Sequence, residues 1–434
     1  MKKKFLLSAC SLVLAGILLF LSVSCGQREI VINETDLLQE YLGSQEAGTL
    51  PLKAQETKGT ELTAAFQKKM AQFAFSLLNK TMLATGQGEN QLLSPLSAMY
   101  CLALIVNGAG EKTRAQMSEV LGMEPEELNP SLLAYMLGLS DTADAKMKMA
   151  NSVWFRNVES LQIKESFLKT VADWYQAQIY TSDFDEETVK NINAWCEKYT
   201  NGMIKKIIED IGTSSMLYLI NALVFDAKWQ TEYEDNQVRE GKFTNVKGEK
   251  ETVTFLDSTE GIYLESQAFE GVVKYYKGGD YAFVGLLPKT GTDAAALAET
   301  LTGEDWLAAW NNRSYETVYT KIPEFKTEAS IELTDLLKAM GMTDAFNAGA
   351  ADFLPMGTYN GGSLYLSGVY QKTYLELDRN GTKAAAVTWG EMKATSIGPA
   401  EDPKYIYLDR PFVYMIVDTQ YGIPSFIGVA ESMK

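Results

Sequence analysis

The sequence contains no histidine among its 434 residues. This absence excludes hydrolases whose general base is an imidazole, and it excludes metal sites with imidazole ligands. Basic residues are also in the minority, because 39 Lys and Arg stand against 56 Asp and Glu, for a formal net charge of −17. Nucleic-acid binding needs clustered basic side chains that release counterions. Nucleic acid is therefore not an expected partner.

Cysteine is scarce as well. Of the four cysteines, Cys10 and Cys25 belong to the N-terminal segment, which leaves Cys101 in an apolar run and Cys196 in a helical pattern. Two such residues make no disulfide framework, and we expect buried free thiols rather than a disulfide. The chain after residue 60 also lacks repeats and Gly-rich or Pro-rich linkers, which favours one domain.

The N-terminal segment has the pattern of an export signal. Three lysines at positions 2–4 precede an apolar run over 5–23, and small residues at Ser22 and Ser24 precede Cys25. A retained membrane helix is the alternative, because the run is nearly long enough to span a bilayer. Residues 21–25 resemble a loose bacterial lipobox. We therefore expect a lipoprotein signal peptide over 1–24, lipidation of Cys25, and attachment to the bacterial cell envelope, at the outer membrane or cell surface.

The remaining chain divides into a tether and a domain. Residues 25–57 show little periodicity and are expected to be a lipidated N-terminus with a flexible tether, followed by a single domain over 58–434. The spacing of Phe66, Met70, Phe73 and Leu77 predicts a helix. Further helices are expected over 97–107, 165–178, 187–200 and 331–340, and strands over 217–225, 252–256, 271–276, 281–287, 317–322, 363–377, 405–408 and 412–418. Early helices and late strands indicate an α+β fold.

Three weaker patterns have structural explanations. Residues 108–113 resemble the end of a phosphate-binding loop but lack its spacing, so a helix C-terminal turn is expected. Acidic clusters at 124–127 and 183–187 could supply an acid and base pair, but a solvated surface is expected in so acidic a chain. The scattered tryptophans are expected in the core rather than at a sugar site: Trp154, Trp195, Trp229, Trp306, Trp310 and Trp389.

The segment 376–399 is the exception. It connects two predicted strands by roughly 25 residues, well above the usual handful, which indicates a functional or a disordered segment. If it were extended, Thr382, Ala384, Ala386 and Thr388 would share one small, uncharged face. Such a face can enter a packed sheet without burying charge. A flexible linker is the alternative interpretation.

Short motifs in a fixed order resemble the serpin family over nearly all of residues 60–434. They are 93–98 (LSPLSA), 107–110 (NGAG), 150–155 (ANSVWF), 192–195 (INAW), 200–204 (TNGMI), 219–229 (LINALVFDAKW), 322–325 (IPEF), 341–346 (GMTDAF), 351–353 (ADF) and 409–412 (DRPF). The resemblance implies an α+β fold of about nine helices around three sheets. It also implies an exposed reactive loop at about 380–404.

The resemblance further implies a function. A serine or cysteine protease would cleave the loop as a substrate, and the cut loop would enter the central sheet as a new strand while the protease stays trapped as an acyl-enzyme. The protein would then be a protease inhibitor and not an enzyme. It would act as a monomer without a cofactor, with the target protease as its partner and the lipid anchor as its contact with the membrane.

Family positions carry over residue by residue. The reactive bond falls at Thr395–Ser396, which suits elastase-like or subtilisin-like proteases, with Lys393 (trypsin-like enzymes) and Met392 as alternatives. The hinge comprises Gly381, Thr382, Ala384, Ala385, Ala386 and Thr388. The polar cluster and strand ends that control sheet opening, called the shutter and the breach, comprise Ser94, Ser97, Asn221, Trp229 and Gln371. Gln371 stands where the family usually has histidine.

Two other functions stay open at this stage. A non-inhibitory serpin would keep the fold and act as a binding protein, without trapping any protease. A lipoprotein hydrolase that uses carboxylates would turn over a substrate without being consumed.

Overall fold

The structure is a computed structural model that describes residues 30, 32–43, 51–86, 88–139, 141–212, 214–382 and 402–434. Cys25 and the expected reactive bond therefore lie outside the described residues, as do the hinge positions after Thr382. Within the described part, no helix is both long enough and apolar enough to cross a membrane.

Nine α-helices follow residue 60 in this part of the chain. They are α3 (Ala64–Thr85), α4 (Pro95–Val106), α5 (Glu111–Leu121), α6 (Pro125–Gly138), α7 (Glu165–Trp174), α8 (Glu186–Tyr199), α9 (Ala294–Thr300), α10 (Gly303–Asn311) and α11 (Thr334–Met340). The predicted helix around Phe66 is confirmed as α3, and its four apolar residues are buried. It begins at Thr63, whose hydroxyl accepts a hydrogen bond from the Phe66 amide at 3.1 Å.

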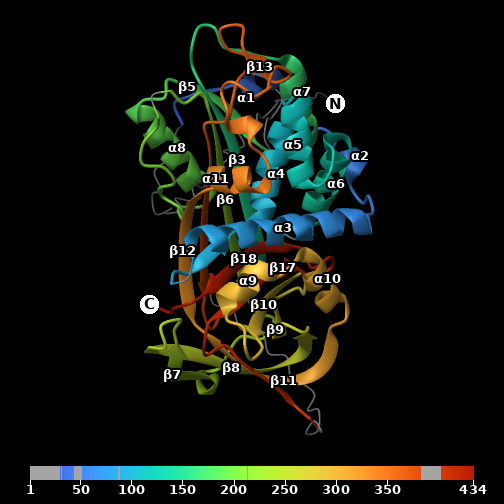
Figure 1. The fold of residues 1–434 in the computed structure, drawn as a ribbon, viewed down its shortest axis with the longest axis vertical. Coiled ribbons are helices and arrows are strands. Elements are labelled where there is room, and N and C mark those ends of the chain that lie inside the picture. Colours follow the sequence, from blue (N-terminus) through green and yellow to red (C-terminus); the bar gives the residue numbers. More distant parts are fainter. Residues whose placement is uncertain are drawn as a thin grey trace, which may run out of the picture. The chain divides into compact units, whose positions relative to one another are not determined.

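The first sheet has seven strands in the order β1-β5-β3-β6-β15-β14-β12. They are β1 (Thr35–Asp36), β5 (Gln178–Ser182), β3 (Ala145–Arg156), β6 (Leu217–Lys228), β15 (Gly381–Thr382), β14 (Gly368–Leu377) and β12 (Phe325–Glu332). Figure 1 shows these strands running along the long axis of the domain, with α8 on one side and α4 on the other. Alternate residues of β6 pack against residues of α8 and against the main core.

The second sheet has nine strands. β16 (Lys404–Tyr407), β11 (Ser314–Pro323), β8 (Lys250–Glu265), β9 (Phe269–Tyr275), β10 (Tyr281–Pro288), β17 (Phe412–Asp418), β18 (Pro424–Ala430) and β2 (Gln91–Leu93) follow in this order, and β7 (Val238–Thr244) pairs with β8. A two-stranded sheet joins β4 (Gln162–Ile163) and β13 (Gly357–Thr358). The 16-residue β8 pairs with both β9 and β11 and so joins the two parts of the nine-stranded sheet.

Several predicted boundaries need correction. Ile331 lies in β12 rather than in a helix, because the residues from Phe325 onward alternate between buried and exposed positions, the period of a strand. The helix predicted over 165–178 ends at Trp174, and Gln178 already begins β5. Helix α6 was not predicted, since Pro130 lies inside it. The α+β class is confirmed.

Part of the predicted tether is ordered. β1 pairs antiparallel with β5, and α1 (Leu37–Leu42) follows at once, with the Asp36 carboxylate accepting hydrogen bonds from the Leu38 and Gln39 amides. Leu38 is buried in the main core. A short helix α2 (Ala54–Thr57) follows. A flexible tether over the whole of 25–57 is therefore not what the structure shows.

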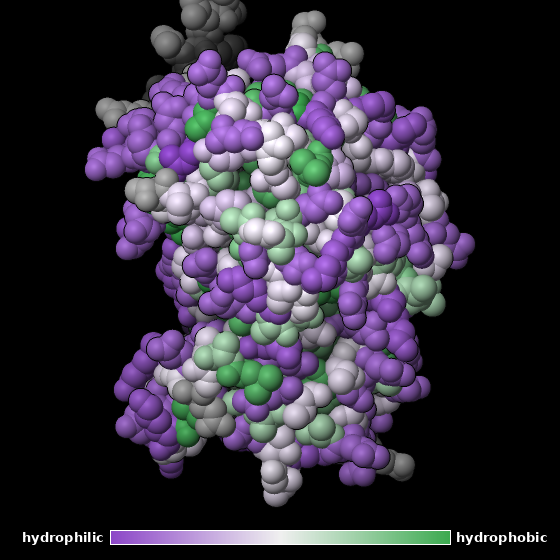
Figure 2. Space-filling view, turned by 45° about the horizontal axis from the view of Figure 1, so that its top comes forward, coloured by the Kyte–Doolittle hydropathy of each residue, from purple (hydrophilic) through white to green (hydrophobic). Residues whose placement is uncertain are grey.

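Most other apolar residues are inside the fold. Trp154, Trp195, Trp229, Trp306 and Trp310 are buried, as expected from the sequence. Cys101 and Cys196 are free and buried, and burial raises the pKa of each thiol to about 12. Figure 2 shows one face of the molecule covered mainly by hydrophilic residues, with hydrophobic ones in small separate patches.

Candidate functional site

The candidate site is the line along which β6 and β14 meet in the seven-stranded sheet, which we call the slot. The two strands pair directly and in parallel over seven residues, from Gly368 opposite Tyr218 to Tyr374 opposite Val224. Beyond that point β15 lies between them. Its two residues pair antiparallel with β6, and Thr382 also pairs with Leu377 of β14. The chain that precedes residues 383–401 therefore already occupies the end of the slot.

Gly381 is required where it enters the sheet. A Cβ atom at this position would lie 2.0 Å from the Ala227 carbonyl oxygen and 2.7 Å from Lys228 Cα, both of which are backbone atoms. A tight turn precedes it, because the Asp378 carboxylate accepts hydrogen bonds from the Asn380 and Gly381 amides at 2.7 and 3.1 Å. The turn and the missing side chain together bring β15 against β6.

Thr382 is held by a buried aromatic stack. Its hydroxyl lies 2.5 Å from the Tyr276 hydroxyl, and neither residue is exposed. The Tyr276 ring stacks on Trp229 with centroids 4.4 Å apart, and burial raises the pKa of Tyr276 well above its usual range. Tyr276 therefore stays neutral and is free to donate or accept the hydrogen bond to Thr382.

Trp229 connects this stack to the turn. Its indole Nε1 donates to the Asp378 carbonyl at 2.8 Å, and its backbone amide donates to the Asn380 carbonyl at 2.9 Å. The buried Lys274 ammonium lies 5.3 Å from the Trp229 ring and forms an ion pair with Glu260 at 2.8 Å. Both the ring and the carboxylate stabilise the buried charge.

A second polar group lies further down the slot. Asn151 of β3, Asn221 of β6 and Gln371 of β14 are direct neighbours in the register of the sheet, and all three are buried. The Asn221 amide group donates to Asn151 Oδ1 and, at 3.0 Å, to the Ser97 carbonyl. The Ser97 hydroxyl donates to Asn221 Oδ1. This row links three strands to the start of α4.

The Gln371 side chain binds both the backbone amide and the backbone carbonyl of Ser94. Its Oε1 accepts from the Ser94 amide at 2.9 Å, and its Nε2 donates to the Ser94 carbonyl at 2.8 Å. The Ser94 hydroxyl donates to the Ser425 carbonyl at 2.9 Å. The structure thus brings together the predicted shutter residues Ser94, Ser97, Asn221 and Gln371, and it places Trp229 with the hinge. An amide side chain satisfies both backbone groups without a titratable proton.

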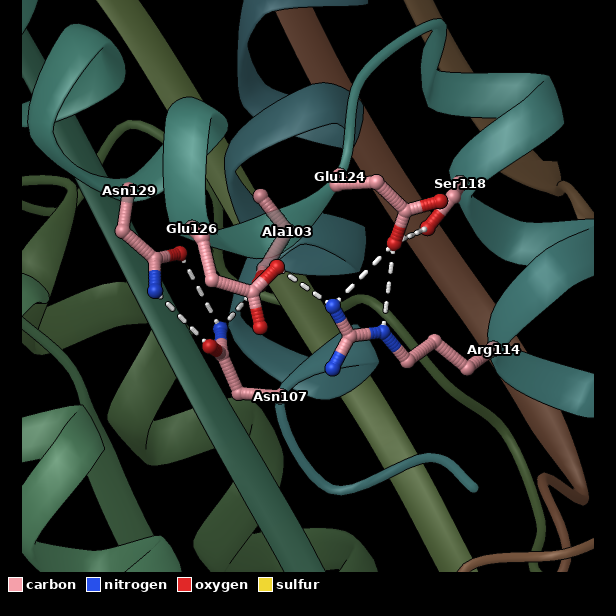
Figure 3. A network of polar contacts seen from close by, with 7 residues as sticks. All are labelled: Ala103, Asn107, Arg114, Ser118, Glu124, Glu126 and Asn129. Atoms are coloured by element: carbon pink, nitrogen blue, oxygen red, sulfur yellow. Dashed lines mark hydrogen bonds and ion pairs between the residues drawn. The ribbon is translucent and has the colours of Figure 1, made fainter. Parts of the chain in front are cut away.

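The other sequence patterns serve local structure. Figure 3 shows Asn107, at the end of α4, bound to Asn129 of α6, and Arg114 bound to Glu124 and Glu126. The hydrogen bond to Arg114 holds the pKa of Glu126 below its usual range. The Asp185 carboxylate caps α8 by accepting from the Thr188 amide at 2.9 Å. These carboxylates have structural partners, namely Arg114 and the first turn of α8.

The glycines at 108–110 do not cradle a phosphate. A Cβ at Gly108 would meet the Met356 side chain at 2.6 Å, and the Gly110 amide donates to the Asp352 carbonyl at 2.9 Å. The turn at the end of α4, expected from the sequence, is what the structure shows. Within the described ranges, no three metal-ligating side chains gather in one place.

A family model described as "Serpin (serine protease inhibitor)" matches residues 68–432. This chain is a serpin. The match covers the slot, the shutter row and the strands on both sides of residues 383–401. Serpins in general are protease inhibitors, so the family supports a protease as the kind of partner.

Known relatives agree with this assignment. Serpin-ZXA of Oryza sativa subsp. japonica is 29% identical over 363 residues, which cover 80% of this chain and 90% of the relative. The crystal structure of tengpin, a thermophilic serpin, in its native state is 36% identical, with a TM-score of 0.83, and covers 92% of this chain and 99% of tengpin. Tengpin in its latent state gives a TM-score of 0.75 and covers 86% of this chain.

Sequence reasoning did not find every residue of the serpin's slot. Asn151, Tyr276 and Lys274 contact predicted residues but lie on β3 and β9 or next to them, far away in the chain. The only signal in the sequence was Asn151 within the family motif at 150–155. Ala384, Ala385, Ala386 and Thr388 lie outside the described residues.

Proposed function

We propose that this serpin is a suicide-substrate inhibitor of serine proteases, with cysteine proteases as a second target class. The observation that carries the proposal is that β15 already lies between β6 and β14 and pairs antiparallel with both strands. Strand addition at this slot requires no new register, because Gly381 and Thr382 already define one.

That register places the small residues of the loop on the core side. Continuing from Thr382 opposite Ala227, an inserted strand would bring Thr388 opposite Asn221 on β6 and opposite Gln371 on β14. Ala384 and Ala386 would face the core in the same way, since side chains alternate along a strand. Thr388 would thus enter the shutter row as another small polar group.

The same register places the larger residues on the opposite face. Lys383 would lie between Asp226 and Glu376, two carboxylates that suit its charge. Trp389 would lie beside Ile220 and Tyr370, on the face that packs against residues of α8. Neither position forces a charge into the core.

The proposed reaction is acyl transfer without turnover. The protease nucleophile attacks the Thr395 carbonyl carbon, the bond to the Ser396 nitrogen breaks, and the Ser396 amine leaves. The acyl-enzyme persists because insertion of the loop carries the attached protease away and disturbs its catalytic geometry. A small β-branched residue at 395 favours elastase-like or subtilisin-like targets, while cleavage after Lys393 or Met392 would indicate other specificities.

We also propose a lipid anchor at Cys25, which would hold this monomeric inhibitor at the bacterial cell envelope. The support is the sequence alone, namely the three lysines at 2–4, the apolar run over 5–23 and the cysteine that follows.

The test mixes residues 32–434 with elastase-like, trypsin-like and subtilisin-like proteases. A denaturing gel reports the adduct, and mass spectrometry of the released peptide reports the bond. We expect an SDS-resistant adduct and a fragment that begins at Ser396. Cleavage of the loop by an active protease with no adduct would contradict inhibition and favour a binding protein with the serpin fold.

A pair of arginine variants tests insertion itself. Ala386→Arg would place a charge on the core side of the register, opposite Leu223, and should convert the inhibitor into a substrate. Lys383→Arg keeps the charge on the other face and is the matched control, which should still form the adduct. Equal adduct yields from both variants would refute this register.

A further inference from the structure

The outer face of β11 and β16 carries tyrosines where charged residues are expected. β16 is the edge strand of the nine-stranded sheet, and Ile406 points into the core while Tyr405 is 55% exposed. Tyr319 of β11 is 40% exposed. Edge strands are usually protected by charge, and exposed aromatic clusters mark interaction sites. We call Tyr319, Tyr405 and Tyr407 the tyrosine face.

The tyrosine face is a preformed surface. Tyr319 and Tyr405 are direct register partners, and their rings stack with centroids 5.5 Å apart. Tyr407 follows two residues later on the same side, with its centroid 6.0 Å from that of Tyr405. The Lys321 ammonium lies 4.8 Å from the Tyr407 ring. Rigid stacked tyrosines lose little conformational entropy on binding, and they accept apolar and arginine side chains from a partner.

The tyrosine face also lies where a protease must dock. Lys404, the first residue of β16, is nine residues after Thr395, so the two are separated by at most about 30 Å of extended chain. A protease domain of roughly 220 residues has a radius of gyration of about 17 Å. A compact domain of this size is roughly 40 Å across, so an enzyme bound at the reactive bond is wide enough to span the distance to the strand that follows it. Figure 1 shows β11, with which β16 pairs, at one end of the domain, away from α1.

We propose that the tyrosine face is a second contact surface for the protease that cleaves the reactive loop. This inference rests on the proposed function only for the choice of that protease. The continuity of β16 with the cleaved segment favours a protease over an unrelated partner, because the loop brings its surface to these rings. Contacts here would raise the rate of the encounter and would not alter the loop sequence that enters the active site.

The test measures the rate of loop cleavage, summed over adduct and cleaved product, for the three protease classes. The variants are Tyr319→Thr with Tyr405→Thr, which keep strand propensity, and Tyr405→Lys alone, which keeps an edge residue of similar length. Tyr41→Ala, on α1, removes a tyrosine that is 37% exposed and serves as the control. Thermal unfolding verifies that each variant folds.

We expect the second-order rate constant to fall at least fivefold for one protease class with both tyrosine-face variants and to stay unchanged for Tyr41→Ala. A synthetic peptide of residues 383–401 should be cleaved at one rate, whatever variant is present. Unchanged cleavage rates for all three classes would overturn the proposal. Slower cleavage without any adduct would support the tyrosine face and, separately, contradict inhibition.

Discussion

Replacement of Gly381 by alanine would act directly on the hinge. The new Cβ would lie 2.0 Å from the Ala227 carbonyl oxygen, a contact that side chains do not make, so β15 would have to leave the slot. That move breaks three register pairs, two with β6 and one with β14. At about 1 kcal/mol for each net hydrogen bond the loss is about 3 kcal/mol, and a loss of this size in the transition state of insertion corresponds to a rate change of about a hundredfold. The lower backbone entropy of alanine in the unfolded chain offsets at most about 1 kcal/mol.

The assay is the stoichiometry of inhibition, the number of serpin molecules consumed for each protease inactivated. If insertion slows by this factor while hydrolysis of the acyl-enzyme does not, the stoichiometry should rise at least tenfold for Gly381→Ala. Gly261→Ala is the matched control, because a Cβ at Gly261 would meet nothing within 4 Å. Equal stoichiometry for both variants and the wild type would refute the reasoning.

Two further predictions concern buried polar groups. Gln371→Leu removes both hydrogen bonds to Ser94 and leaves the buried Ser94 amide without a partner, so the thermal unfolding midpoint should fall by several degrees. Tyr135→Phe removes the hydroxyl that donates to Asp418 at 2.9 Å. Burial raises the pKa of Asp418 to about 6, above its value in the unfolded chain, so its contribution to stability is present below about pH 4 and is lost as the pH rises through 6. The free energy of unfolding that Tyr135→Phe removes should therefore be larger at pH 7.5 than at pH 5. An equal loss at both pH values would contradict this pKa.

Much of the fold could be predicted from local pattern. The helical spacing of Phe66, Met70, Phe73 and Leu77 leaves one apolar face, and that face is buried in α3. The alternation of small residues from Thr382 onward also places Thr382 on the core side of the sheet, and there it faces the buried Tyr276. In both cases the information lies within a few residues of the chain.

The rest depends on contacts between distant segments. The alternation from Phe325 to Glu332 fits a strand, but where this strand ends and α11 begins depends on its pairing with β14. The ion pair of Lys274 with Glu260 and the place of Asn151 in the shutter row depend on how β9, β8 and β3 lie in their sheets. Order in Thr35–Leu42 likewise depends on the open edge of β5, which no local pattern reveals.

The direct pairing of β6 with β14 makes a seam in the seven-stranded sheet. β6 pairs antiparallel with β3 on its other side, and β14 pairs antiparallel with β12, so the parallel ladder lies between two antiparallel ones. Parallel ladders are slightly weaker for each residue. A strand entering at β15 would exchange one parallel ladder for two antiparallel ladders. In the proposed insertion the sheet would part along the β6–β14 ladder, while β3 stays paired with β6 and β12 stays paired with β14.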